Sequence, residues 1–250
     1  SKLFYNTEID SLEGFNFDTK NVQDFSFFFA NTKINEINLS KLNTNKALNM
    51  SHMFADCSYI TSLDFSNFIT KGVQDMSYMF KSSQGLSNLD LSFFDTSNVK
   101  NMSGMFSDCM SLTNINLQSF DTNKVEDMSS MFDNCCSLTS LNLGNFKTNN
   151  VKYMGKMFKY CTKLEKLDLR NFETINAEDM NSMFYSDRSL TELNINFETN
   201  KVKNMSNMFY FCDNVKKLVL SKFVTENVVD TSNMFSECSS LVSLKELENW

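Results

Sequence analysis

A pattern of apolar positions recurs along the chain with a period of about 26 residues. The dipeptide Met-Phe marks each copy, and the Phe residues of successive copies are 25 or 26 residues apart. The copy over residues 99–125 reads VKNMSGMFSDCMSLTNINLQSFDTNKV. Self-similarity at this period predicts one supersecondary unit stacked many times. The nine copies carry Phe29 (in a Phe-Phe variant), Phe54, Phe80, Phe106, Phe132, Phe158, Phe184, Phe209 and Phe235.

Two periodicities follow one another within each copy. From Met102 the apolar residues are spaced i, i+3, i+4 and i+7, which predicts a short helix with one buried face and Asn101 as its N-cap. From Leu112 the spacing becomes LxxLxL, and its period-two alternation predicts a short strand. The predicted core columns in this copy are Met105, Phe106, Cys109, Leu112, Ile115, Leu117, Phe120 and Thr122.

Stacking is the way in which such short elements can bury their apolar sides. Successive strands are then expected to pair in parallel, and the bulkier helical side should curve the stack with its strands on the concave surface. We predict one solenoid domain over 1–250, with an irregular N-terminal cap at 1–16, repeats at 17–244 and a C-terminal end or cut point at 245–250. Thr122 has a Thr counterpart in every copy, which we interpret as a hydroxyl bonded to its own turn.

The repeat has a family resemblance. The string V-x-[DN]-M-S-x-M-F-x-x-C-x-S-L-x-x-[IL]-x-L-x-x-F-x-T resembles the 26-residue leucine-rich repeat of BspA-like bacterial surface proteins, above all the Met-Phe-rich subgroup of mycoplasma and Gram-positive surface proteins and lipoproteins. The resemblance covers roughly residues 12–247 and weakens at Glu13-Gly14-Phe15 and Lys245-Glu246-Leu247. It implies an α/β repeat solenoid, a leucine-rich-repeat-like right-handed coil. It further implies surface display, for some members adhesion to host matrix or other cells, and no catalytic residues.

Composition and charge narrow the possible partners. The 250 residues are 42% hydrophobic with a formal net charge of −7, and neither half is basic, which argues against nucleic acid as a partner. We find no window that approaches the roughly 20 apolar residues of a membrane-spanning helix. The first residues are neither a signal peptide nor an initiator Met, which indicates a processed chain or a piece of a longer one.

The residues that could carry chemistry have simpler structural interpretations. Six of the seven cysteines fall three residues after the repeat's Phe, so we expect buried free thiols rather than disulfides or metal ligands. His52 is the only histidine and is expected on the solvated side of its repeat. Asp64 and Asp90 lie on an open strand surface, where nothing is expected to shift their pKa values. We therefore predict no catalytic residues, no metal site and no cofactor.

The outward strand position is the best candidate for a binding surface. It is Asn or Asp in seven of the nine copies, which is typical either of an amide ladder along the sheet or of a polar recognition face. The sixth copy, with Lys166, Asp168 and Arg170, breaks the neutral pattern, and Arg is favoured at interfaces. The candidate ligand-binding residues are Asn116, Asn142, Lys166, Asp168, Arg170 and Asn194.

Two functions compete on this evidence. The first is a non-enzymatic binding or adhesion module, displayed outside the cell or on its surface, that recognises a protein or cell-surface ligand through the solenoid surface. The second is a structural unit whose coils associate end to end into a fibre or surface layer.

Overall fold

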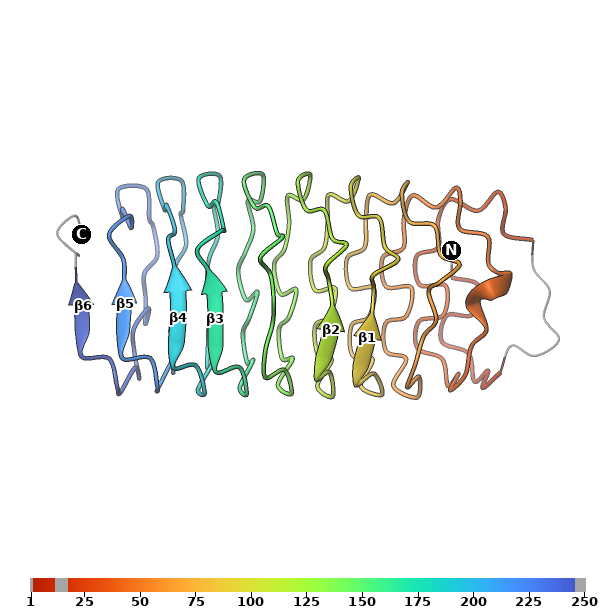
Figure 1. Ribbon diagram of the computed structural model, residues 1–250, viewed down its shortest axis with the longest axis horizontal. Coiled ribbons are helices and arrows are strands. Elements are labelled where there is room, and N and C mark those ends of the chain that lie inside the picture. Colours follow the sequence, from red (N-terminus) through yellow and green to blue (C-terminus); the bar gives the residue numbers. More distant parts are fainter. Residues whose placement is uncertain (1, 12–17, 246–250) are drawn as a thin grey trace.

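The repeats form one continuous stack of coils. The computed structural model describes residues 2–11 and 18–245 of the chain. The coils stand side by side in a row along the long axis, in the order of the sequence (Figure 1). Each coil is named below by the Phe of its Met-Phe pair, so that residues 99–125 begin in the Phe106 coil. The predicted solenoid of parallel coils is therefore confirmed, while the predicted curvature stays a prediction.

Regular secondary structure is sparse in the described residues. It consists of one 3-10 helix, η1 (Leu39–Lys41), and six strands in three parallel pairs. In register, Leu167 lies opposite Leu193 and Ile115 opposite Leu89, so like residues of neighbouring coils stack. The strands are β1 (Asn88–Asp90), β2 (Asn114–Asn116), β3 (Lys166–Leu169), β4 (Glu192–Ile195), β5 (Lys217–Val219) and β6 (Ser243–Lys245), and the pairs are β1–β2, β3–β4 and β5–β6.

The prediction of a short helix in each repeat is wrong for the described residues. Every second backbone N–H group of this segment bonds to the next coil, as when Met102 N donates to Asp127 O at 2.9 Å. Within the coil the segment makes only four-residue β-turns, such as the one closed by Met105 N donating to Met102 O at 3.2 Å. Gly104 and Asp108 have φ values of 57° and 61°, and a left-handed residue at every fourth position breaks a right-handed helix.

These stacked turns form a second ladder of backbone hydrogen bonds, separate from the strands. Parallel bridges connect it from Asp24 through each coil to Asp230. Asn101 Oδ1 accepts from Ser103 N at 2.9 Å, so the predicted capping residue does bind a backbone N–H group, but it opens a turn. A succession of turns returns to the interior every three or four residues, and for this reason it produces the same apolar spacing as a helix.

The threonine column connects neighbouring coils. Thr122 Oγ1 donates to Lys147 O at 2.8 Å and accepts from Lys147 N at 2.7 Å, across one full repeat. The prediction that the hydroxyl binds its own turn is wrong. It is the backbone carbonyl of Thr122 that closes that turn, accepting from Val125 N at 3.1 Å.

The core lies between the two ladders and is continuous along the stack. The Phe rings of successive coils stack face to face, with centroids 5.8 Å apart for Phe80 and Phe106 and 5.5 Å apart for Phe106 and Phe132. Ile115 is partly buried. The other predicted core residues of this copy are buried, namely Met105, Phe106, Cys109, Leu112, Leu117, Phe120 and Thr122.

Residues 2–7 belong to the stack. Phe4 N donates to Phe28 O and Asn6 N to Ala30 O, both at 3.1 Å, and the Phe4 ring lies parallel to that of Phe29 with centroids 5.8 Å apart. These residues therefore repeat the Met-Phe turn 25 positions upstream, where the sequence predicted an irregular cap. Residues 12–17 and 246–250, which include most of both predicted departures from the repeat, lie outside the described residues.

Candidate functional site

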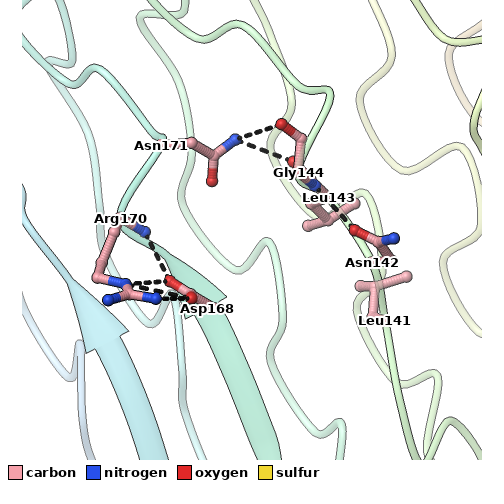
Figure 2. Close-up of a pocket in the computed structure, with 7 residues that line it drawn as sticks. All are labelled: Leu141, Asn142, Leu143, Gly144, Asp168, Arg170 and Asn171. Carbon is pink, nitrogen blue, oxygen red and sulfur yellow. Dashed lines mark hydrogen bonds and ion pairs between the residues drawn. The ribbon is translucent and has the colours of Figure 1, made fainter.

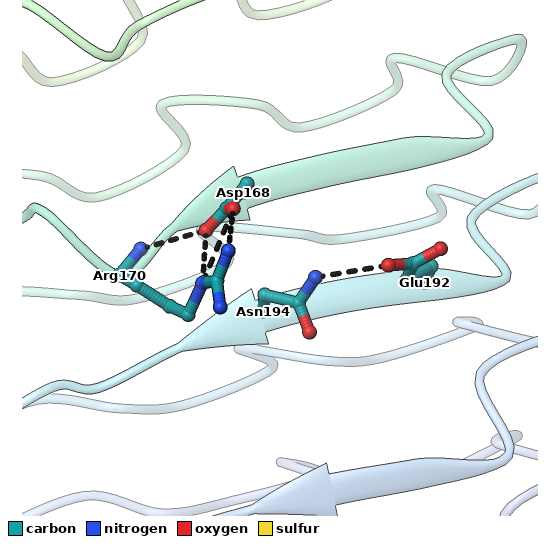
Figure 3. Close-up of polar contacts among 4 residues, drawn as sticks. All are labelled: Asp168, Arg170, Glu192 and Asn194. Carbon is teal, nitrogen blue, oxygen red and sulfur yellow. Dashed lines mark hydrogen bonds and ion pairs between the residues drawn. The ribbon is translucent and has the colours of Figure 1, made fainter.

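The sixth copy's charges form a fixed pair on β3. Arg170 Nε lies 2.9 Å from Asp168 Oδ1 and Arg170 Nη2 lies 2.5 Å from Asp168 Oδ2, so the guanidinium binds the carboxylate in a bidentate manner (Figure 3). Both side chains are exposed. The hydrogen bonds from Arg170 lower the pKa of Asp168. At neutral pH the pair is therefore ionised, pre-oriented and open to solvent.

The Asn/Asp column has a structural task in most coils. Asp168 Oδ1 accepts from Arg170 N at 3.1 Å, and Asn142 Oδ1 accepts from Gly144 N at the same distance. Each such side chain fixes the turn that follows its strand position. An amide ladder along the sheet was also predicted, but in the described residues the column shows one bond between coils, from Asn116 Nδ2 to Asp90 Oδ1 at 3.0 Å.

The pairing of β3 with β4 brings several candidate residues together. Lys166 lies in register with Glu192, and its Nζ is 3.3 Å from Glu192 Oε2. Asp168 lies in register with Asn194, whose Nδ2 donates to Glu192 Oε1 at 3.1 Å (Figure 3). The sequence analysis did not select Glu192, although opposite charges one repeat apart on a strand could have indicated it.

The candidate residues do not form one compact cluster. Asn116 lies on β2, and Asn142 lies in the coil between β2 and β3. The side chain of Asn116 donates a hydrogen bond to Asp90 and accepts one from the N–H group of Gln118 at 3.2 Å. The group on β3 and β4 therefore offers most of the exposed charge, and Asn116 and Asn142 lie to one side of it.

Two hollows flank Arg170. The larger has a volume of about 590 Å³ and opens beside Gly144, which occupies the position of Arg170 in the preceding coil (Figure 2). Because glycine has no side chain, Arg170 faces an open space there. Asn171 Nδ2 bounds this hollow and donates to Leu143 O at 3.0 Å. The lining residues are Leu141, Asn142, Leu143, Gly144, Asp168, Arg170 and Asn171.

The second hollow, of about 320 Å³, lies on the other side of Arg170. Lys222 and Glu198 pair at its border, with Lys222 Nζ 3.1 Å from Glu198 Oε1. Sequence analysis did not select these residues or Gly144. The lining residues are Arg170, Phe172, Glu173, Thr174, Ile175, Asn196, Glu198 and Lys222.

The cysteines are free thiols, and five of the seven are buried. Cys109 Sγ donates to Phe80 O at 3.0 Å. Burial raises the pKa of Cys57 to about 11 and that of Cys109 to about 12, so these thiols are protonated at neutral pH. A protonated, buried thiol is a poor nucleophile and a poor metal ligand. Among the residues that the structure describes, no group of three or more His, Cys, Asp or Glu side chains is arranged to hold a metal ion.

His52 is not the solvated residue that was expected. Its ring is stacked between Phe27 and Tyr78, with centroids 4.2 Å and 4.9 Å away, and burial lowers its pKa. Asp64 and Asp90 also differ from expectation, since hydrogen bonds from the backbones of Ser66 and Ser92 lower their pKa values. Both carboxylates are ionised at neutral pH and cannot serve as general acids.

The described residues contain no helix with the length and apolarity needed to cross a lipid bilayer.

Fold and surface together define a class: a leucine-rich-repeat-like solenoid built of 25- to 26-residue coils with short parallel strands. The chain belongs to the family described as "Mycoplasma protein of unknown function, DUF285", whose model matches residues 1–115, 83–192, 109–219 and 166–250. This confirms the predicted resemblance to Met-Phe-rich mycoplasma repeats. Comparison with curated proteins gives no match.

Several solved structures are similar to parts of the chain. A leucine-rich repeat protein from Eubacterium ventriosum is 14% identical, with a TM-score of 0.39 over 80% of this chain and 42% of that one. One from Bacteroides ovatus is also 14% identical, with a TM-score of 0.38 over 86% and 74%. A chain of the Drosophila Toll–Spätzle complex is 17% identical, with a TM-score of 0.44 over 84% and 28%. The chain spans less than half the length of the first and third, and these likenesses are too weak to carry functional inference.

Proposed function

We propose that this chain is a non-enzymatic protein-interaction module that binds a protein or cell-surface ligand through its strand face at β3 and β4. The observation that carries the proposal is the position of Arg170 between two hollows, oriented by Asp168 and exposed to solvent. Oriented arginines beside concave surface are favoured at protein interfaces, because the guanidinium offers several donors with little further ordering.

The charges around Arg170 favour a polar ligand of mixed charge. Lys166 pairs with Glu192 and Arg170 with Asp168, so each exposed cation has an anion beside it. A protein surface with alternating charges could replace these partners one for one, whereas a purely anionic polymer would face two carboxylates. Such exposed pairs contribute little to stability, which leaves them free to exchange partners.

Display outside the cell and adhesion form the finer part of the proposal. They are supported by the resemblance of the repeat to BspA-like surface proteins. End-to-end association of the solenoid stays a prediction, and sedimentation velocity over a range of concentrations would detect it.

The experiment compares binding of the wild-type chain with that of a Lys166→Ala/Arg170→Ala variant to purified matrix proteins and to defined cell-surface fractions. A Lys152→Ala/Lys203→Ala variant is the matched control, because it removes two cations that are likewise paired with carboxylates but that lie on the second ladder. We expect the first variant to lose at least tenfold in affinity and the control to bind like the wild type. Equal binding by all three proteins would exclude the β3–β4 face as the binding site.

A further inference from the structure

One column of the core ends each Met-Phe segment with a hydrogen-bond donor. The column lies three residues after the repeat's Phe. Its Ser or Cys side chain donates to the carbonyl oxygen of the Phe of the preceding coil, whereas Thr32, in the Phe29 coil, donates to Phe29 O of its own coil at 2.9 Å. Ser83 Oγ lies 2.6 Å from Phe54 O, and Cys212 Sγ lies 3.1 Å from Phe184 O. The same bond is made by Cys57, Cys109, Cys135, Cys161 and Cys238. Asp187, in the Phe184 coil, holds this position with a carboxyl group.

The carboxyl group of Asp187 lies beside the carbonyl that the column normally binds. Cys161 N donates to Phe158 O at 3.0 Å and to Asp187 Oδ1 at 2.8 Å, so the two acceptor oxygens share one N–H group. Asp187 is fully buried, and its Oδ2 has no hydrogen-bond partner. A carboxylate here would therefore place a buried negative charge next to a carbonyl oxygen, with half of its acceptors unsatisfied, which is costly.

The titratable groups around Asp187 do not supply a compensating positive charge. In the described part of the chain these groups are Cys161 in the preceding coil, Cys212 in the following coil and Asp133 two coils earlier. The neighbouring Arg188 is directed elsewhere, since its guanidinium lies over the Phe211 ring, 4.8 Å from the centroid. Burial raises the pKa of Asp187 well above its ordinary value of 3.8, and the charge of Asp133 acts in the same direction.

We propose that Asp187 is a protonated carboxylic acid at neutral pH, donates its hydroxyl hydrogen to the carbonyl of Phe158, and thereby makes the Phe184 coil a pH-sensitive joint in the solenoid. The proton takes the place of the thiol hydrogen that the other coils supply. It satisfies both the Phe158 carbonyl and the unpartnered Oδ2 with one bond, and it removes the buried charge.

The sign of the pH dependence follows from proton binding. The folded chain retains a proton at Asp187 that the unfolded chain releases above the ordinary value of 3.8. Stability is then fully present below that value and falls as pH rises towards the pKa of the folded state. In that window this residue raises the unfolding equilibrium constant by up to about tenfold per pH unit. Because coils contact only their neighbours, the loss is concentrated where the Phe184 coil meets the Phe158 and Phe209 coils.

The test measures denaturant unfolding between pH 4.5 and 8.5 for the protein that retains Asp187 and for its Asp187→Asn and Asp187→Cys variants. Asn keeps the volume and offers an N–H donor, and Cys restores the residue found in most coils. All three proteins also carry Asp133→Asn, because burial raises the pKa of Asp133 to about 6 and its titration would overlap. We expect the protein with Asp187 to lose stability relative to both variants with rising pH. Parallel pH profiles for the three proteins would overturn the proposal.

Two further measurements keep the test decisive. Amide exchange should show that the opening of residues 158–212 accelerates with pH when Asp187 is present. The opening should not accelerate with pH when Asn or Cys replaces Asp187. Opening that is insensitive to pH in the protein with Asp187 would contradict the proposed pH-sensitive joint. If neither variant folds, the infrared spectrum of the folded Asp133→Asn protein at pH 7 decides, because in that protein the carboxyl group of Asp133 cannot contribute to the spectrum. A protonated carboxyl band that survives in the folded protein supports the proposal, and its absence refutes it.

Discussion

Thr122 and Lys147 are joined by two hydrogen bonds through one hydroxyl group. The Thr122 hydroxyl donates to the backbone carbonyl of Lys147 and accepts from its N–H group, across one repeat. The same reciprocal pair recurs between Thr70 and Asp95. At the corner of the coil the turn prevents regular strand pairing. The hydroxyl of the buried threonine there supplies the donor and the acceptor that a neighbouring strand would otherwise supply. The same pair of bonds is made by Thr19, Thr96, Thr174 and Thr199, which explains the Thr of this column in these copies.

Replacing Thr122 with Val should destabilise the solenoid. Valine keeps the β-branched shape but removes the hydroxyl, so the N–H and carbonyl groups of Lys147 both lose their partner. We expect a loss of about 1–3 kcal/mol in the free energy of unfolding, measured by denaturant titration. Thr122→Ser, which retains the hydroxyl, is the control and should lose less. Equal losses for the two variants would mean that the methyl group, rather than the hydroxyl, is the important part of the side chain.

The sequence was sufficient to predict the stack but not the path of each coil. Periodicity at 26 residues fixes which side chains meet between coils, and Phe106 does lie between Phe80 and Phe132. The spacing after Met102 could not distinguish a helix from successive turns, since both bring the chain back to the core every three or four residues. The left-handed conformation of Asp108 decides between them, and it has no signature in the apolar pattern.

The candidate site, too, was predictable from the sequence only in part. The three charges of the sixth copy were enough to select Lys166, Asp168 and Arg170, because a departure from the pattern of a repeat is visible in the sequence. The larger hollow beside Arg170 depends on the missing side chain of Gly144, one coil earlier, and on the turn that Asn171 holds. Such features arise from neighbours in space whose joint effect appears only once the coils are in register.

Gly104 should be intolerant of a side chain. Its φ is 57°, and a β-carbon there would lie 2.1 Å from Tyr78 Cε1, so the ring would have to leave its position. We expect Gly104→Ala to lower the free energy of unfolding by about 1–3 kcal/mol. Gly144→Ala is the matched control, because Gly144 is not in the left-handed region and its β-carbon would meet only Asn142 Oδ1, at 3.3 Å. Similar stability of the two variants would contradict this account.

The thiols should differ sharply in reactivity. Cys135 and Cys161 are fully buried, and burial raises their pKa values well above the ordinary range. Cys136, which lies outside the column, is only partly buried. At pH 8 a disulfide reagent should therefore modify Cys136 first and the buried thiols only after unfolding. Mass spectrometry of the labelled protein identifies the sites. Cys238 is also partly buried, but burial raises its pKa, so it should react more slowly than Cys136. Cys136→Ser should therefore abolish the fast phase. Fast labelling of Cys135 in the folded protein would be incompatible with this packing.

Asp133 should give a pH dependence opposite in sign to that of Asp64. Burial raises its pKa to about 6, so the folded chain holds a proton that the unfolded chain releases above 3.8. Its stabilising contribution is complete below pH 3.8 and is lost as pH rises through 6, so the wild type should lose stability relative to Asp133→Asn over that range. Asp64 has a lowered pKa, so the wild type should instead gain stability relative to Asp64→Asn as pH rises towards 3.8. Denaturant titration from pH 3 to 7 measures both differences. Slopes of the same sign would mean that the Asp133 carboxyl is solvated rather than buried.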